Sequence, residues 1–130
     1  MGYGRNARER GAIMAYLPEQ GDIITLDFNP QAGHEQKGRR PALVVSNNIF
    51  NSFTKMAMVC PITNTERGFP LHVALDERTT TTGVIMCEQV KTLDILARDA
   101  AFKEKMPEDI VKEIIDILFG FIESPSHSST

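Results

Sequence analysis

A series of short apolar segments, each closed by turn-forming residues, constrains the fold of this chain most. Glycine, proline, asparagine and charged residues separate the segments at intervals that suit strands rather than helices. The segments are Asp22 to Phe28, Pro41 to Ser46, Met56 to Ile62, Leu71 to Leu75 and Val84 to Leu93. Their number and spacing predict a mainly β domain with a small, strongly bent sheet or barrel.

The last apolar segment follows a different period. It begins after Pro107, where Glu108 and Asp109 suit the positive end of a helix dipole. Apolar residues then recur every three or four positions, at Ile110, Ile114, Ile117, Leu118 and Phe121. This spacing predicts a C-terminal amphipathic α-helix, which either caps the sheet or pairs two subunits.

A single domain accounts for the organised part of the chain. We expect it to span residues 16–123, between a flexible N-terminal arm of residues 1–15 and a disordered tail of residues 124–130. Hydrophobic residues make up 42% of the chain and charged residues 24%, as in ordinary globular proteins. No apolar run approaches the roughly 20 residues that a membrane-spanning helix needs. We therefore expect a cytoplasmic protein that does not enter a membrane.

The cysteines and histidines give no pattern for cofactor chemistry. Cys60 and Cys87 each lie inside an apolar segment rather than in a CxxC pair, which predicts reduced thiols in the core of a cytoplasmic protein. His34, His72 and His127 are too scattered to form a metal-binding motif. The sequence thus predicts neither a metal site nor a bound cofactor.

A charged loop leads directly into the second apolar segment. It reads Gly33-His34-Glu35-Gln36-Lys37-Gly38-Arg39-Arg40-Pro41. The formal net charge of −3 excludes proteins that coat nucleic acid by bulk attraction, so the cations of this loop form a local positive site on an acidic body. Such a site favours an anion, and a phosphate in particular.

The residue types around this loop suit acid–base chemistry on a phosphate. Glu35 can accept a proton, and Arg40 can hold an oxyanion with a bidentate fork. Pro41 biases the backbone of Arg40 toward an extended conformation. Thr63 ends the third segment and can donate to the same phosphate if the two segments pair. From the residues alone, a surface ion pair of Glu35 with Arg40 and a turn role for Thr63 stay open.

Several motifs follow one another in a characteristic order. They are Gly21-Asp22-Ile23, Phe28-Asn29-Pro30, Gly33-His34-Glu35-Gln36, Arg39-Arg40-Pro41 with Ala42-Leu43-Val44-Val45-Ser46, Pro61-Ile62-Thr63, Gly68-Phe69-Pro70 and Glu88-Gln89-Val90-Lys91-Thr92-Leu93-Asp94. In this order the chain resembles the MazF/PemK family of toxin endoribonucleases, from about Tyr16 to Glu123. The pattern GxEQxGxRP followed by an apolar strand is a specific signature.

The resemblance implies a fold, an activity and a set of partners. The fold is an SH3-like small β-barrel with added helices, one of them a C-terminal α-helix. Family members form homodimers whose interface groove holds single-stranded RNA, and they cut messenger RNA without a metal or other cofactor. A cognate antitoxin silences them by laying an extended segment across the groove. The related CcdB-like toxins share the barrel but bind a topoisomerase, so a non-catalytic inhibitor is the alternative.

By the family's motif, Arg40 and Thr63 match the catalytic pair, and Glu35 matches an acidic residue needed for activity. The corresponding hypothesis makes Glu35 the base, with Arg40 holding the transition-state phosphate and Thr63 orienting one of its oxygens. His34 is either an alternative acid or base, given the near-neutral pKa typical of histidine, or a loop residue without a role. The residues expected to contact RNA are Gln36, Lys37, Arg39, Gln89 and Lys91.

The chain departs from one branch of the family. That branch has an arginine at the position of Met86 and an aspartate at that of Glu88, and these two perform its acid–base chemistry. Met86 cannot titrate, so we expect Glu88 to be a groove or structural residue. We expect base choice to depend on groove loops at Asn47 to Lys55 and Asn64 to Gly68.

Overall fold

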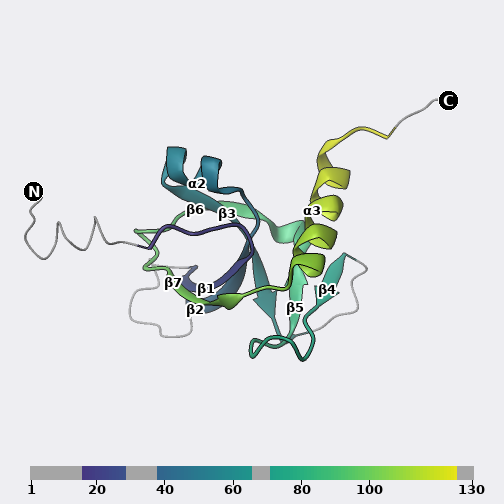
Figure 1. Ribbon diagram of the computed structural model, residues 1–130, viewed down its shortest axis with the longest axis horizontal. Coiled ribbons are helices and arrows are strands. Elements are labelled where there is room, and N and C mark those ends of the chain that lie inside the picture. Colours follow the sequence, from purple (N-terminus) through teal and green to yellow (C-terminus); the bar gives the residue numbers. More distant parts are fainter. Residues whose placement is uncertain (1–15, 29–37, 66–70, 126–130) are drawn as a thin grey trace, which may run out of the picture.

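The computed structural model describes residues 16–28, 38–65 and 71–125 (Figure 1). The predicted N-terminal arm and residues 126–130 of the predicted tail lie outside the described residues. In chain order the elements are β1 (Asp22–Asp27), β2 (Arg39–Val44), α2 (Asn48–Thr54), β3 (Met56–Thr63), β4 (His72–Ala74), β5 (Val84–Met86), the 3-10 helix η3 (Cys87–Gln89), β6 (Lys91–Asp94), β7 (Ala101–Lys105) and α3 (Glu108–Ile122).

Seven antiparallel strands form one bent sheet around the long strand β3. Its hydrogen-bonded order is β4-β5-β3-β2-β1-β7, and β6 also pairs with β3. One edge of β3 is shared, because β6 pairs with Met56 to Val59 and β5 with Ile62 and Thr63. The sheet is not closed into a complete ring of strands. The predicted mainly β fold with a C-terminal helix is confirmed.

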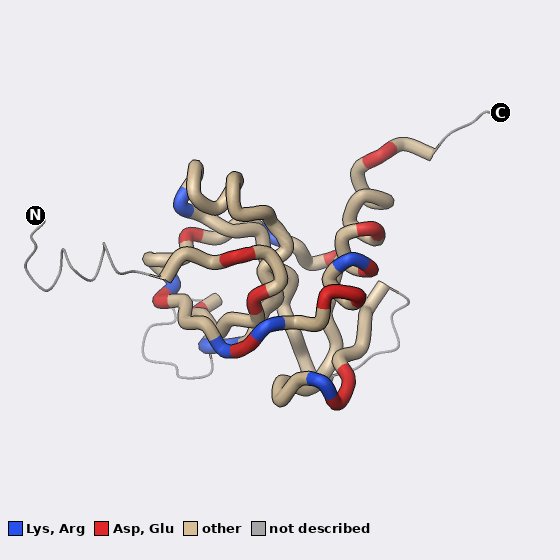
Figure 2. Tube along the Cα trace, in the orientation of Figure 1, with Lys and Arg blue, Asp and Glu red and all other residues tan. Residues whose placement is uncertain are grey.

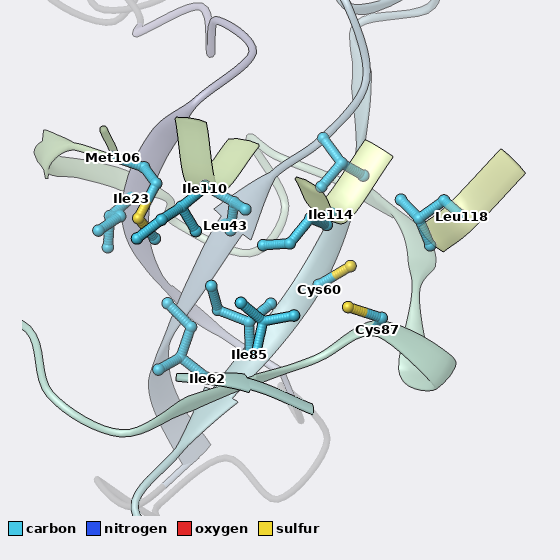
Figure 3. Close-up of a cluster of buried hydrophobic side chains, with 12 residues drawn as sticks. Ile23, Leu43, Cys60, Ile62, Ile85, Cys87, Met106, Ile110, Ile114 and Leu118 are labelled. Carbon is cyan, nitrogen blue, oxygen red and sulfur yellow. The ribbon is translucent and has the colours of Figure 1, made fainter. Parts of the chain in front are cut away.

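Two hydrophobic cores lie on opposite faces of β2 and β3, since neighbouring residues of a strand point to opposite sides. The first, here called the helix-side core, includes Leu43 and Cys60 and is covered by α3 through Ile110, Ile114 and Leu118 (Figure 3). The second, here called the strand-side core, consists of Ile24, Leu26, Ala42, Val44, Ala57, Val59, Leu93 and Ile95. Strands β2 and β3 are thus covered by a core on each face.

The predicted C-terminal helix and the predicted core thiols are both confirmed. Helix α3 starts after Pro107 and buries one stripe, while Phe119 and Ile122 are exposed at its end. Cys60 and Cys87 are free and buried in the helix-side core, with their sulfur atoms directed toward one another (Figure 3). Burial raises the pKa of Cys60 to about 12 and that of Cys87 to about 11. Among the described residues, no helix is long and apolar enough to cross a membrane.

The single strand predicted from Val84 to Leu93 is wrong. The chain makes β5, then η3, then β6. The two strands pair with different halves of β3, so the chain must step along that edge between them. The amide of Val90 donates to Cys87 O at 3.2 Å and closes the 3-10 turn that makes this step. The spacing of apolar residues from Val84 to Leu93 does not indicate where the chain moves from one half of β3 to the other.

The segment from Asn47 to Lys55, expected as a groove loop, forms the helix α2, and its part in base choice stays a prediction. The side chain of Asn47 caps the helix by accepting from Phe50 N at 2.9 Å. Asn51 is fully buried, and its Nδ2 donates to Pro18 O at 2.9 Å. Lys55 ends the helix in the left-handed region, with φ of 61°.

Strand β7 is an element that the sequence analysis did not predict. It pairs with β1, and most of its residues are exposed. Without a buried face it lacks the alternation of apolar and polar residues on which strand prediction depends.

Candidate functional site

Arg40 and Thr63 lie at the same end of the neighbouring strands β2 and β3. The strands pair antiparallel, with Ala42 opposite Pro61. The same register continued by two residues brings Arg40 opposite Thr63. The sequence expectation that these two strand ends meet is therefore supported by the pairing.

The regular ladder between β2 and β3 stops before Arg40 for a chemical reason. The amide of Val45 donates to Met58 O at 2.9 Å, so alternate residues of β2 direct their backbone toward β3. Pro41 falls in that series and has no N–H to donate. The backbone around Arg40 thus leaves the ladder while β2 remains paired with β1, where Arg40 is opposite Leu26.

Both side chains point to the strand-side core. Arg40 is two residues before Ala42, and Thr63 is four residues after Val59, so each shares a face with a member of that core. Arg40 is exposed and Thr63 is half-buried. Strand alternation therefore assigns Arg40 and Thr63 to one face at this end of the two strands. A guanidinium and a hydroxyl are both groups that bind anions.

Lys91 and Phe28 place a cation and an aromatic ring on the same face. Lys91 begins β6 opposite Val59. Its Nζ is 5.5 Å from the centroid of the Phe28 ring, a cation–π distance. Phe28 is half-buried and packs against the strand-side core. An ammonium group beside an aromatic face suits the phosphate and the base of a nucleotide.

The charged loop before β2 is anchored at both of its described ends. Phe28 N donates to Gly38 O at 3.0 Å, next to the pair that Asp27 makes with Arg39. The predicted site residues His34, Glu35, Gln36 and Lys37 lie outside the described residues. The chain nevertheless enters and leaves this loop at the end of the sheet that holds Arg40.

Arg39 is separated from the other candidates. As the neighbour of Arg40 in β2 it points to the opposite face. There its Nη2 donates to Thr25 Oγ1 at 3.2 Å, and its Nη1 is 3.6 Å from Asp99 Oδ2. Arg39 therefore lies on the face opposite that of Arg40 and has contacts of its own there.

The hydroxyl of Thr63 has one of its hydrogen bonds already fixed. Thr65 N donates to Thr63 Oγ1 at 3.1 Å. Because a hydroxyl both accepts and donates, this contact leaves the hydrogen of Thr63 for another acceptor. The turn after β3 thus orients Thr63 as a donor.

The remaining predicted residues lie along η3 and β5. Gln89 is exposed in η3 rather than in a strand. Glu88 Oε2 lies 3.2 Å from His72 Nε2 of β4, a contact that fits the structural role expected of Glu88. Met86 is half-buried and opposite His72 in the register of β4 and β5.

Positive and negative residues alternate along the described part of the chain. Figure 2 shows Lys and Arg positions interspersed with Asp and Glu. This agrees with the net charge of −3 and with nucleic-acid binding that depends on a few cations at defined positions.

The Phe28 ring and the threonine-rich segment before β5 were not predicted from the sequence as parts of the site. The run of four threonines followed by Gly83 was the available signal for a constrained turn.

Comparisons with known proteins agree on one family. The family model described as PemK-like, MazF-like toxin of type II toxin-antitoxin system matches residues 19–119. Endoribonuclease toxin MazF of Escherichia coli (strain K12) is 37% identical over 111 residues, which cover 83% of this chain and 99% of that protein. Endoribonuclease PemK of Escherichia coli is 40% identical over 101 residues, covering 75% of this chain and 76% of the relative.

A solved structure extends the likeness to the fold. A chain in the crystal structure of MazE-MazF (Form-III) from Deinococcus radiodurans matches with a TM-score of 0.74 and 33% identity. The match covers 82% of this chain and 97% of that chain. The likeness therefore spans the whole bent sheet and α3 rather than a local motif.

Proposed function

Because this chain belongs to the PemK-like, MazF-like family and is an endoribonuclease toxin of a type II toxin–antitoxin system, we propose that it cuts single-stranded messenger RNA in an active site that includes Arg40 and Thr63. The observation that supports this proposal is the pairing of Ala42 with Pro61, because the same register continued by two residues aligns Arg40 with Thr63. A guanidinium fork and an oriented hydroxyl can together hold a phosphodiester. The reaction we propose needs no metal.

Cleavage proceeds by attack of the RNA's own 2′-hydroxyl. A base removes the 2′ proton, the 2′ oxygen bonds to phosphorus, and the bond from phosphorus to the 5′ oxygen breaks. A proton then passes to the 5′ oxygen, which leaves a 2′,3′-cyclic phosphate and a 5′-hydroxyl. The protein must supply a base, an acid and stabilisation of the phosphorane charge.

The role of each residue follows from its chemistry. Arg40 stabilises the charge on the equatorial oxygens, and Thr63 donates to one of them. Arginine is a poor acid because its ordinary pKa exceeds about 12, so it does not supply the proton for the leaving group. Glu35 is the base, and His34 is the candidate acid, because a histidine side chain ordinarily titrates near neutral pH.

RNA contacts extend from the reacting phosphate along the same face. We assign a backbone phosphate to Lys91 and base stacking to the Phe28 ring beside it, since stacking on aromatic side chains is common in single-strand recognition. Gln36, Lys37 and Gln89 supply further polar groups. Arg39, which contacts Thr25 and Asp99 on the opposite face, is left out of this assignment.

We further propose that the protein acts as a cytoplasmic homodimer controlled by a cognate antitoxin. Exposed apolar side chains at the end of α3 support contact with a second copy, with Phe119 61% and Ile122 76% exposed. The likeness to MazF in a MazE-MazF complex supports an antitoxin partner. A cytoplasmic location follows from the substrate, which is messenger RNA.

The decisive experiment uses a long single-stranded RNA and the matching DNA, each incubated with purified protein in EDTA. We expect cleavage of the RNA alone, with 2′,3′-cyclic phosphate and 5′-hydroxyl ends identified by mass spectrometry. Fragments with 3′-hydroxyl ends, or cleavage that stops in EDTA, would contradict the proposed chemistry. Intact RNA together with inhibited DNA supercoiling would instead favour the topoisomerase alternative.

A further inference from the structure

We propose that Glu104 of β7 and Gly83, which precedes β5, are positioning residues for Thr63, acting through the threonine-rich segment of residues 79–83. The inference rests on the proposed function because it takes Thr63 as a phosphate-contacting residue. It assigns a role in RNA cleavage to two residues that do not themselves reach the substrate.

Glu104 accepts four hydrogen bonds from two consecutive threonines. Its Oε1 accepts from Thr80 N at 3.0 Å, and its Oε2 accepts from Thr81 N at 2.8 Å. The hydroxyls of Thr80 and Thr81 donate to Oε2 at 2.9 Å and 2.6 Å. Each carboxylate oxygen therefore receives one backbone N–H, and these groups can only donate.

The ionised form of Glu104 is strongly favoured. Burial by itself raises its pKa, but the hydrogen bonds from Thr81 and Thr80 outweigh this and lower the pKa to about 2. At neutral pH the ionised Glu104 carboxylate therefore holds the threonine-rich segment against β7 by hydrogen bonds. Thr81 is 3% exposed and Thr79 is 8% exposed, so this part of the threonine-rich segment packs against the rest of the domain.

The held segment continues directly into contacts with the end of β3. Thr82 Oγ1 donates to Asn64 Oδ1 at 3.0 Å, beside Thr63. Gly83 then packs against the carbonyl of Thr63, where an added Cβ would overlap the oxygen and lie 2.8 Å from the carbon. The φ of Gly83 is +116°, a region that favours glycine. Val84, the next residue, is the pairing partner of Thr63.

These contacts form a continuous path from Glu104 to the candidate catalytic hydroxyl. The Glu104 carboxylate holds Thr80 and Thr81 by hydrogen bonds. Gly83, two residues after Thr81, is in close contact with the backbone carbonyl of Thr63. Thr63 itself lies beyond the last residue of β3 that pairs with β2. In β2, Pro41 has no N–H to donate to this end of β3. Small displacements of a group that contacts a transition state are costly to catalysis.

The first test is Glu104→Gln. The amide is nearly isosteric, but whichever way it is turned, its NH2 faces a backbone N–H of Thr80 or Thr81. We expect kcat for RNA cleavage to fall about fourfold with KM within twofold of wild type. The matched control is Glu77→Gln, the same change at an exposed residue of the loop that contains the threonine-rich segment, without a hydrogen bond or ion pair to any described residue. It should cut like wild type.

A double-mutant cycle with Thr63→Ala tests whether Glu104 acts through Thr63. If it does, Glu104→Gln changes kcat less than 1.5-fold when Thr63 is already alanine. An undiminished fourfold effect in that background would overturn the inference, as would a Glu104→Gln protein that cuts like the Glu77→Gln control. Gly83→Ala provides a second approach, and we expect it to reduce kcat about as much as Thr63→Ala does.

The outcomes also separate this inference from the proposed function. If wild-type protein leaves RNA intact, the proposed function fails. If wild type cuts and Thr63→Ala cuts equally well, the role of Thr63 fails and the positioning inference fails with it. If Thr63→Ala is impaired but neither Glu104→Gln nor Gly83→Ala lowers kcat per folded molecule, only the positioning inference fails. Circular dichroism and thermal unfolding establish the folded fraction of each variant.

Discussion

Arg40 and Thr63 end neighbouring strands at the same place, but the structure beneath them differs. Behind Arg40, strand β2 pairs with β1 on one side and β3 on the other, and Ala42, Leu43 and Val44 are completely buried. Thr63 lies past the end of the ladder with β2 and pairs only with Val84 at the start of β5. Its surroundings are a turn and a threonine-rich segment held by side-chain hydrogen bonds.

The difference indicates which changes will mainly affect stability and which will mainly affect catalysis. The backbone of Arg40 shares the stability of the two cores, so it is displaced only when the domain unfolds. The position of Thr63 depends on a local segment that can move while both cores stay intact. Substitutions behind Arg40 should therefore lower the free energy of unfolding, whereas substitutions around Thr63 should lower kcat.

Removing the Arg40 side chain should give the largest effect. Arg40→Ala loses the guanidinium that stabilises the transition-state charge, and arginines in phosphoryl-transfer sites are worth about 10³-fold or more in rate. We expect such a loss of RNA cleavage in single-turnover assays, with an unchanged thermal midpoint. The control is Lys103→Ala, which removes an exposed cation from β7 and should retain full activity. Normal cleavage by Arg40→Ala would remove this residue from the site.

Truncation of the core behind Arg40 comes next. Leu43 is fully buried in the helix-side core, so Leu43→Ala should lower the free energy of unfolding by about 3 kcal/mol. Because Arg40 stays on the same strand, cleavage per folded molecule should be unchanged at a temperature where the variant is folded. Urea unfolding and single-turnover rates measure the two quantities. A loss of activity in fully folded Leu43→Ala would mean that the strand does not isolate Arg40 from the core.

The Thr63 hydroxyl should contribute less than the Arg40 guanidinium, because it is a single neutral donor. Thr63→Ala should slow cleavage about tenfold, near the upper end of what one neutral hydrogen bond contributes. Thr63→Ser keeps the hydroxyl and the bond from Thr65 N, so it should recover most of the rate. Equal rates for the serine and alanine variants would show that the hydroxyl plays no part.

The smallest expected effect is on stability in acid. The pKa of Glu104 is lowered to about 2 in the folded protein, from 4.5 in the absence of interactions. Its contribution to stability is therefore present above about pH 4.5 and is lost as the pH falls toward 2. The difference in thermal midpoint between wild type and Glu104→Gln should be a few degrees at pH 6 and should shrink toward pH 2. A difference independent of pH would mean that the carboxylate charge does not hold the threonine segment.

Those parts of the molecule that depend on local pattern could be predicted from the sequence. Short apolar segments bounded by turn-forming residues predicted β1 and β3, and the helical period after Pro107 predicted α3. The signature around Arg40 located one half of the site, and the end of an apolar run located Thr63. The register that aligns them needed the pairing of β2 with β3, which no local pattern encodes.

The parts that sequence reasoning missed depend on contacts between distant segments. Strand β7 has no buried face, and α2 is held by Asn51, a polar residue whose burial depends on Pro18 far back in the chain. Glu104 resembles any surface glutamate until the fold brings Thr80 and Thr81 to its carboxylate. The spacing of apolar residues likewise does not show that the strands on either side of η3 pair with different halves of β3.

The two cysteines give the protein an internal reporter of its own integrity. A thiol reacts with alkylating reagents as the thiolate, and burial keeps Cys60 and Cys87 almost fully protonated at neutral pH. Iodoacetamide should therefore label them only when α3 lifts from the sheet or the whole domain unfolds. Labelling measured by mass spectrometry can distinguish a variant that has lost a site residue from one whose core has opened, without adding any probe to the chain.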